Sequence, residues 1–460
     1  MRHDFLLGMG LSCLAWAITA HAEPVDLGSR RELFVDNCLI AKLQGDVGLC
    51  MHQPVPREVV LVTDAPWEGN TCAYFTFFQD GDLYRAYYRG AHYDTEKRRS
   101  AHRELTCYAE STDGIHWTKP ELGLFEFEGS KANNIVRDAE GSHNFTPFKD
   151  ANPACRPEAR YKALASGKGG LLAFQSADGI QWSQMAEKPA ITKGAFDSQN
   201  LAFWDPARGG YLDFHRGFRD GVRDIMTCTS GDFLRWTEPE WLHYGDAPTE
   251  HLYTNAILPY ARAPHVLLGF PSRFLPKTQQ VEPILMSSRD GRVFHRWSEP
   301  VIPVTAPEDR DGNRSNYMAW GMLQLPGNDR ELSMYASEAY YTGPDSRIRR
   351  FTYRVDGFVS ARAGAKGGEL LTPLITFTGT ALTLNFTTGQ WGRVRVEIQD
   401  EAGKPIEGFS VADCVAMEGD DIHGTVRWNA ATELGALAGR PVRLRFVMKD
   451  ADLYSLRFGD

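Results

Sequence analysis

The sequence predicts an all-β protein, a five-bladed β-propeller followed by a C-terminal β-sandwich. The first observation is a short pattern that occurs four times, as STDGIHW, SADGIQW, SGDFLRW and SRDGRVFHRW, beginning at Ser111, Ser176, Ser230 and Ser288. Successive serines are 65, 54 and 58 residues apart, a period that suits one four-stranded propeller blade per copy. A degenerate fifth copy, RVDGFVS, begins at Arg354. We therefore expect five blades.

Each copy of the pattern has the composition of a tight turn between two strands. Asp hydrogen-bonds its own backbone and Gly accepts a positive φ, so Asp-Gly favours such a turn. The tryptophan that follows is a large apolar side chain, which we expect to pack between neighbouring blades. Because a catalytic residue has no reason to recur once per blade, we interpret the repeated residues as scaffold.

The second observation is a change in strand pattern along the chain. From Leu33 to about Phe358, short apolar runs are separated by Gly, Asp, Asn and Pro, without long helical periodicity. After Ser360 a Gly-rich stretch leads into strands that alternate polar and apolar residues, as a sheet with one wet face does. We interpret this second region as structural support or a carbohydrate-binding module. The predicted domains are a signal peptide over residues 1–22, a propeller with the candidate catalytic site over residues 23–360, and a β-sandwich over residues 361–460.

The N-terminus is typical of a cleaved secretion signal. Arg2 and His3 precede an apolar run over residues 5–18, and a small-x-small site follows at residues 20–22. The run is too short for a membrane span. We expect cleavage after Ala22, no membrane span, and a periplasmic or secreted protein. The seven remaining cysteines show no disulfide-framework spacing, and we interpret most of them as buried thiols.

Charge and motifs remove several classes of function. A formal net charge of -9 argues against binding nucleic acid through its phosphates. The sequence has no Gly-rich phosphate loop, HExxH or CxxC pair, and we expect no cofactor. Residues 309–313, DRDGN, have the oxygen-rich composition of a calcium loop but lack the closing Glu, so we interpret them as a turn. His143 and His251 are interpreted as hydrogen-bonded histidines and not as metal ligands.

Residues that depart from the repeat are the candidates for function. We expect them on the innermost strand of each blade, near the central axis, about 30 to 45 residues before each hairpin. Carboxylates suit acid and base chemistry, amide and guanidinium groups bind sugar hydroxyls, and aromatic rings stack on sugars. The predicted carbohydrate site comprises Asp64, Glu68, Asn144, Asp150, Asp197, Asn200, Arg216, Glu250, Tyr253, Asn255, Arg314, Asn316 and Trp320.

With these residues the chain resembles the five-bladed propeller glycoside hydrolases, the superfamily of families 32, 43, 62 and 68. Those enzymes carry S-x-D-x-x-x-W hairpins and take an Asp from blade one, an Asp from a middle blade and a Glu from the next. The resemblance implies that Glu250 is the general acid, that Asp197 orients it or binds substrate, and that Asp64 or Glu68 is the base or nucleophile. TDAPWEGN, at residues 63–70, replaces the Trp-x-Asn-Asp-Pro motif of the fructan-cleaving members. The whole chain also looks like a group of exported bacterial proteins described as family 32-like.

The predicted function is therefore an exported glycoside hydrolase that cleaves a poly- or oligosaccharide with a pair of carboxylates. A sialidase-like hydrolase is one alternative, in which Arg216, Arg273 and Arg314 bind a substrate carboxylate. Its Asp-box resembles the repeat, but here Asp and Gly are adjacent and five copies are countable. A non-catalytic carbohydrate-binding propeller is the other alternative, since the fructan motif is missing.

Overall fold

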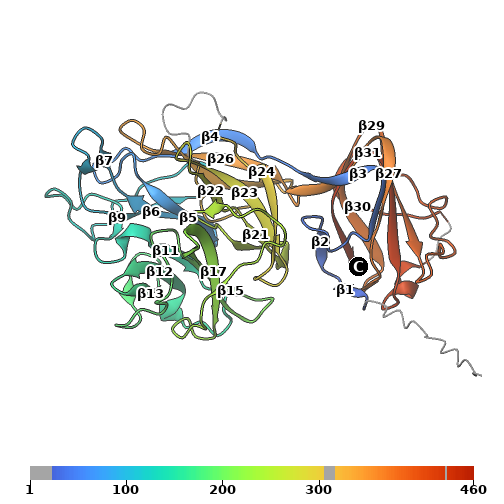
Figure 1. The fold of residues 1–460 in the computed structure, drawn as a ribbon, viewed down its shortest axis with the longest axis horizontal. Helices are drawn as coiled ribbons and strands as arrows, with labels where there is room; N and C mark the ends of the chain where they lie inside the picture. Colours follow the sequence, from blue (N-terminus) through green and yellow to red (C-terminus); the bar gives the residue numbers. More distant parts are fainter. Residues whose placement is uncertain (1–22, 305–315, 430–432) are drawn as a thin grey trace, which may run out of the picture.

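The computed structural model describes residues 23–304, 316–429 and 433–460. It is an all-β structure with a larger and a smaller body (Figure 1). Within these ranges the helices are three short 3-10 turns, η1 (Ser142–Asn144), η2 (Pro157–Ala159) and η3 (Leu434–Leu437), and none is long and apolar enough to cross a membrane. The predicted signal peptide, Arg314 and the DRDGN segment lie outside the described residues.

The larger body begins with three four-stranded antiparallel sheets. In each of them the strands lie side by side in the order in which they occur along the chain. The first contains β5 (Ala73–Asp80), β6 (Leu83–Gly90), β9 (Leu105–Ser111) and β10 (Ile135–Arg137), with a small hairpin of β7 (Tyr93–Asp94) and β8 (Arg99–Ser100) beside it. The second contains β11 (Thr146–Lys149), β12 (Tyr161–Gly167), β13 (Gly170–Ser176) and β14 (Ser183–Gln184). The third contains β15 (Leu201–Asp205), β16 (Gly210–Arg219), β17 (Val222–Ser230) and β18 (Glu240–Trp241).

Two further sheets complete the larger body. The fourth contains β19 (His251–Leu252), β20 (Leu258–Tyr260), β21 (Ala263–Gly269), β22 (Ser272–Leu275), β23 (Gln280–Ser288) and β24 (Phe294–Pro300). The fifth contains β25 (Glu331–Glu338), β26 (Arg347–Arg354) and β4 (Val55–Val62). Because β4 comes from the start of the chain and pairs with β26, hydrogen bonds join the two ends of this body.

Side chains of each sheet contact the repeated turn of the next sheet. In turn order, the contacting pairs are Tyr335 and Gly114, Tyr87 and Gly179, Phe148 and Phe233, Arg208 and Arg289, and Tyr260 and Asp356. These pairs connect sheet five to one, one to two, two to three, three to four and four to five. Each of the five sheets therefore contacts the next one, and the fifth contacts the first.

Every residue of the repeated pattern has a structural use in its turn. The Ser111 hydroxyl accepts the Gly114 N–H at 2.9 Å, and Asp113 accepts the next two backbone N–H groups at 2.8 Å each. The Trp117 indole donates to the Gly114 carbonyl at 3.1 Å. The second and third turns repeat these bonds. In the third turn Phe233 takes the glycine position with a φ of 69°, close to the 74° of Gly114.

The smaller body unites the two ends of the described chain, and Figure 1 shows the blue first strands among the red last ones. Its strands are β1 (Val25–Gly28), β2 (Arg31–Leu33), β3 (Lys42–Met51), β27 (Val359–Leu371), β28 (Ile375–Phe377), β29 (Ala381–Gln399), β30 (Asp420–Thr425) and β31 (Arg443–Gly459). The order β3-β27-β31-β29-β30 forms the main sheet, β2 also pairs with β31, and β1 runs parallel to β28.

These pairings differ from the predicted start of the propeller at residue 23. Residues 25–51 instead contribute strands to the smaller body, where Leu27 and Phe34 belong to its apolar core. The local pattern of these residues is that of short strands, and nothing in it specifies a partner more than 300 residues away. Strand pairing is a long-range choice, so composition alone placed the boundary incorrectly.

Candidate active site

The innermost segments of the five sheets run in one direction, so their ends gather at two places. Their C-terminal ends line an apolar cavity of about 610 Å³, with Phe77, Phe148, Phe203, Leu258 and Trp320 in its wall. The residues at or just before their N-terminal ends are Tyr74, His143, Asp197, Tyr253 and Tyr317. Side chains with titratable groups are therefore concentrated at the N-terminal ends of these innermost segments.

Side chains at this second place form a closed circuit of contacts. Each contacts the next in the order Tyr74, His143, Asp197, Arg216, Tyr253, Tyr317, Tyr340 and Arg89, and Arg89 returns to Tyr74. Glu104 joins the circuit through His143, and Arg223 joins it through Tyr253. We call these ten residues the Asp197 cluster.

An imidazole ring between two carboxylates forms the polar centre of the Asp197 cluster. Nε2 of His143 lies 2.9 Å from Oδ1 of Asp197, and Nδ1 lies 2.7 Å from Oε2 of Glu104. The Asp197 side chain is 66% exposed, while His143 and Glu104 are half-buried. The helix η1 carries His143, and the loop before β15 carries Asp197. Solvent, or a ligand, can therefore reach this group.

The charges in this group stabilise one another. The hydrogen bond from His143, with further attraction from Arg216, lowers the pKa of Asp197 to about 2. Burial of His143 disfavours its charged form, but its hydrogen bonds with Asp197 and Glu104 outweigh burial and raise its pKa. Burial of Glu104 is likewise outweighed by His143 and Arg89, and the pKa of this carboxyl is lowered. The centre is thus an imidazole ring whose charged form is favoured by the two carboxylates that flank it.

The tyrosines of the cluster are held by strained backbone. Tyr74 has a φ of 56°, and Ala339 and Tyr341, on either side of Tyr340, have φ values of 58° and 61°. Such conformations cost about 1–3 kcal/mol each for residues other than glycine, and they gather at functional sites. The Tyr340 hydroxyl accepts a hydrogen bond from Arg89 at 3.1 Å, which fixes its position. Of the eleven described residues other than glycine that have a positive φ, three are therefore in the cluster or next to it.

Three residues predicted for the site lie in the cluster, Asp197, Arg216 and Tyr253, and two others hold it in place. The side-chain amides of Asn144 and Asn200 both donate to the carbonyl groups of Phe196 and Ser198, which flank Asp197. Both asparagines are fully buried. They therefore position the Asp197 loop and do not contact a ligand directly.

Glu250, the predicted general acid, lies elsewhere. Its carboxylate pairs with Arg273 at 3.0 Å and with Arg296 at 3.1 Å. Among the described residues, no hydrogen bond, ion pair or ring contact joins its side chain to Asp197 or to any other member of the cluster. Both of its carboxylate oxygens are therefore held by guanidinium groups. Arg273 is occupied by Glu250 and Glu282, so it does not join Arg216 in an arginine triad.

The predicted carboxylates of the first sheet also form a separate group. Lys119 bridges Asp64 at 3.0 Å and Glu68 at 2.6 Å. Glu68 is buried and accepts a hydrogen bond from the Tyr88 hydroxyl. Lys119 thus brings the two carboxylates together. In the part of the chain that the structure describes, neither carboxylate pairs or hydrogen-bonds with a member of the Asp197 cluster.

The remaining predicted residues are buried structural groups. Asp150 pairs with Lys162 and accepts a hydrogen bond from Tyr211. The Asn255 amide donates to the Phe214 carbonyl, and the Trp320 indole donates to the Ile257 carbonyl at 2.8 Å. Asn316 is also fully buried, with its backbone N–H bonded to the Val281 carbonyl. Burial removes Asn255 and Asn316 from the ligand-accessible surface, whereas Asp150 and Trp320 line the apolar cavity and lie apart from the Asp197 cluster.

The predicted site residues do not include seven members of the cluster, which are Tyr74, Arg89, Glu104, His143, Arg223, Tyr317 and Tyr340. Arg89 is on β6, Glu104 immediately precedes β9, and Arg223 is on β17, so a search restricted to innermost strands excludes them. The Tyr340-Tyr341 pair directly after a strand, followed by Thr-Gly, is the one local signal that could have found part of the site.

Asp213, His215 and Cys228 form the one group in the described residues whose ligand atoms could together hold a metal ion, all within 4.8 Å of one another. Asp213 lies opposite Cys228 on β16 and β17, and all three are buried. The other ring nitrogen of His215 bonds to the Lys193 carbonyl at 3.0 Å. The His215 hydrogen bond with Asp213 accounts for their proximity, and the group supports the loop before Asp197. The seven described cysteines are free thiols.

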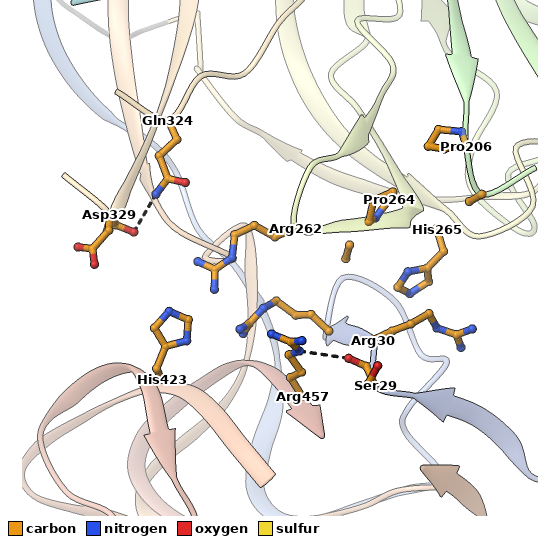
Figure 2. A pocket seen from close by; sticks show the side chains of 13 residues that line it. Ser29, Arg30, Pro206, Arg262, Pro264, His265, Gln324, Asp329, His423 and Arg457 are labelled. Atoms are coloured by element: carbon orange, nitrogen blue, oxygen red, sulfur yellow. Dashed lines mark hydrogen bonds between the residues drawn. The ribbon is translucent and has the colours of Figure 1, made fainter. Parts of the chain in front are cut away.

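A cavity of about 750 Å³ lies where the two bodies meet. Figure 2 shows Arg262 and His423 reaching into this space from opposite sides, with Arg457 beside them. Asp356 pairs with Arg31 at 3.1 Å and with Arg262 at 3.5 Å, and Arg457 donates to the Ser29 carbonyl. These cations have acceptors within the chain. We therefore interpret the cavity as part of the junction between the two bodies.

No protein-family model and no curated protein sequence matches the chain. Solved structures similar to it include a thermostable family-43 glycoside hydrolase, with 11% identity, a TM-score of 0.45, and coverage of 64% of this chain and 95% of that one. An endo-1,4-beta-xylanase from Bacteroides thetaiotaomicron has 14% identity, a TM-score of 0.46, and coverage of 64% and 96%. The beta-1,2-mannobiose phosphorylase from Listeria innocua has 12% identity, a TM-score of 0.46, and coverage of 67% and 97%. These identities are too low to transfer residue roles.

Proposed function

We propose that the larger body is a five-bladed β-propeller that binds carbohydrate at the Asp197 cluster and hydrolyses a glycosidic bond there. In this proposal the smaller body is a β-sandwich that supports it. The observation that carries the proposal is the exposed group of Glu104, His143 and Asp197, in which two carboxylates flank an imidazolium. The tyrosines and arginines around this group are the side chains that bind sugars.

Glycoside hydrolysis needs a proton for the departing oxygen and a negative charge facing the oxocarbenium-like transition state. Asp197, with its pKa lowered to about 2, supplies the negative charge at any physiological pH. His143, with its raised pKa, holds the proton. Glu104 accepts the other ring N–H of His143 and keeps the ring oriented. The glycosidic C–O bond breaks as His143 protonates the leaving oxygen and water adds to the anomeric carbon, and the proton that this water loses restores the charged form of His143.

This assignment replaces Glu250 by His143 as the proton donor and gives Asp197 a direct role. The reason is electrostatic: the carboxylates of this cluster have lowered pKa values, whereas the His143 ring has a raised one. A group serves as an acid near neutral pH when its pKa lies close to the working pH.

Two exposed aromatic rings border the cluster and offer surfaces for further sugar units. The side chain of Phe218 is 51% exposed, and the side chain of Tyr341 is 45% exposed. Phe218 lies under the Arg216 guanidinium, and Tyr341 packs edge-on against Tyr340 at 4.7 Å. We propose that these rings stack on a poly- or oligosaccharide that extends beyond the cluster.

We also propose that the protein is exported, which the pattern of residues 1–22 supports. The polysaccharides such an enzyme would meet lie outside the cytoplasm. Mass spectrometry of the protein from its native host tests this, because a mature chain beginning at Glu23 is expected. An intact N-terminus on the native protein would contradict export.

The experiment for the proposed activity is sugar release from a panel of polysaccharides and aryl glycosides. The wild type is compared with Asp197→Asn and His143→Gln, and Asp82→Asn is the matched control because Asp82 is exposed on a remote hairpin. We expect release by the wild type and the control only. Saccharide binding without release by any variant would instead establish the non-catalytic alternative. Release by Asp197→Asn at the wild-type rate would overturn the proposed site.

A further inference from the structure

The Asp197 cluster contains more positive charge than its own carboxylates balance. Protonated His143 and three arginines face only two carboxylates, those of Glu104 and Asp197. The arginines are Arg89, Arg216 and Arg223. The chain as a whole has a formal net charge of -9, so this local excess is opposite in sign to the rest of the molecule.

Arg223 is the clearest case of an unbalanced cation. Its Nε is buried without a hydrogen-bond partner, and the described residues place no carboxylate within ion-pair distance of it. Its guanidinium lies over three aromatic rings, 4.9 Å from the centroid of Phe274, 5.3 Å from Tyr253 and 5.6 Å from Phe218. The rings fix the orientation of the guanidinium group but do not neutralise its charge.

Arg216 lies beside Arg223 and shares two of these rings. Its guanidinium is 4.8 Å from the centroid of Tyr253 and 5.6 Å from Phe218. Its side chain is 6% exposed, its Nε donates to the Ala195 carbonyl, and its nearest carboxylate oxygen, on Asp197, is 3.7 Å away. Two cations that contact the same two rings repel each other, and an anion bound by both would offset that repulsion.

We propose that the sugar bound at the cluster is acidic and that Arg216 and Arg223 bind its carboxylate or sulfate group. This inference rests on the proposed function for the statement that the ligand is a sugar. Guanidinium groups bind planar carboxylates and tetrahedral oxyanions through paired N–H donors, which a neutral sugar cannot use as well. Phe218, exposed beside both arginines, offers the ring of such a unit an apolar surface.

The location of the cations explains how an acidic protein would bind an acidic polymer. The net charge of the whole chain repels polyanions, whereas the cluster attracts them over about one Debye length, roughly 10 Å at moderate salt. Binding is therefore local, and it weakens as ionic strength rises.

The test is titration calorimetry of the full protein with three probes. These are oligogalacturonate, its fully methyl-esterified form, and a sulfated galactan oligosaccharide. We expect at least one of the two anionic probes to bind at least tenfold more tightly than the neutral ester, about 1.4 kcal/mol. The stronger of the two tells which oxyanion the site accepts. Equal affinity for all three probes, or no binding of either anionic probe, would overturn the proposal.

Variants locate the binding site within the chain. Arg223→Gln should weaken the preferred anionic probe at least tenfold, and Arg223→Lys should recover only part of that loss, because lysine keeps the charge but not the fork. Arg156→Gln is the control, since Arg156 is exposed and pairs with Glu158 alone. Unchanged affinity in Arg223→Gln would overturn the proposal. Binding of an anionic probe without its cleavage would fault the proposed hydrolysis alone, and cleavage of neutral sugars alone would fault the acidic ligand alone.

Discussion

His143 contacts Asp197 through one ring nitrogen at 2.9 Å and Glu104 through the other at 2.7 Å. The ring brings together carboxylates from two different sheets of the larger body. Because both carboxylates favour the charged ring, and the charged ring favours both carboxylates, the protonation states of the three groups are set jointly. The chemistry of the site depends on this relationship more than on any single carboxylate.

The activity should be lost at alkaline pH and kept at mildly acidic pH. The raised pKa of His143 means that the ring keeps its proton to a higher pH than a free imidazole does, and loses it as the pH rises through that pKa. Asp197 gains a proton only as the pH falls towards about 2, so it imposes no loss under mildly acidic conditions. A kcat/KM profile measures this. A profile that rises continuously from neutral to alkaline pH would exclude His143 as the acid.

The stability of the protein should share this pH dependence. A histidine whose pKa is raised by folding stabilises the folded state below its unfolded pKa, and that contribution is lost as the pH rises through the folded pKa. The melting temperature of the wild type should therefore exceed that of His143→Gln more at about pH 5 than at about pH 9. A difference that grows towards alkaline pH would contradict the charged ring.

Asn144 should matter through the loop that it holds. Removing its amide in Asn144→Ala leaves the carbonyl groups of Phe196 and Ser198 with the Asn200 amide alone of these two donors, and it loosens Asp197. Misplacing a catalytic group costs activity even where binding persists, so kcat should fall about 10-fold or more with a smaller change in KM. Asn144→Asp keeps the shape and the acceptor but loses donors. Steady-state kinetics of both variants measure the effect. An unchanged kcat in Asn144→Ala would contradict this role.

Glu250 should contribute to stability and not to the acid step. Glu250→Gln weakens the pairs with Arg273 and Arg296, and we expect a loss of about 1–2 kcal/mol in the free energy of unfolding. Denaturant unfolding measures the loss. The pH profile of the variant should match that of the wild type, and a shifted alkaline limb would return Glu250 to the catalytic group.

Gly114 should be intolerant of a side chain for two reasons that a matched control separates. Its φ is 74°, and an added Cβ would lie 2.4 Å from Cδ2 of Leu325. Gly123 has a φ of 69° with no atom within 4 Å of the same position. Gly123→Ala should cost about 1 kcal/mol from backbone strain, and Gly114→Ala about 1–3 kcal/mol more from overpacking. Equal melting temperatures of the two variants would contradict the packing of this turn.

The all-β class and the turns were predictable because their signals are local. Asp113 and Gly114 form a turn through bonds to residues within the same seven-residue pattern, and the pattern recurs. The destination of β2 was not predictable, since its partner β31 lies at the other end of the chain. Pairing of distant strands depends on the whole fold. The three residues of β2 alone carry no pattern that identifies their partner strand.

The site was predictable only in part, for the same reason. Asp197 and Tyr253 lie where a search of innermost strands looks, because Asp197 shortly precedes β15 and Tyr253 directly follows β19. Arg89 and Glu104 belong to neighbouring strands and reach the site by side-chain length and backbone twist. Glu250 had the right spacing, yet two arginines, one on β22 and the other on β24, bind it instead. Spacing predicts which strand a residue occupies, but not which side chains its neighbours present.

The most direct test compares Asp197→Asn with Glu250→Gln on the same cleaved saccharide. The measurement is kcat/KM for each variant relative to the wild type, at a temperature where both remain folded. We expect a loss of about 10²-fold or more for Asp197→Asn and a change of less than about threefold for Glu250→Gln. The reverse order of losses would place the catalytic centre at Glu250 and contradict the Asp197 cluster.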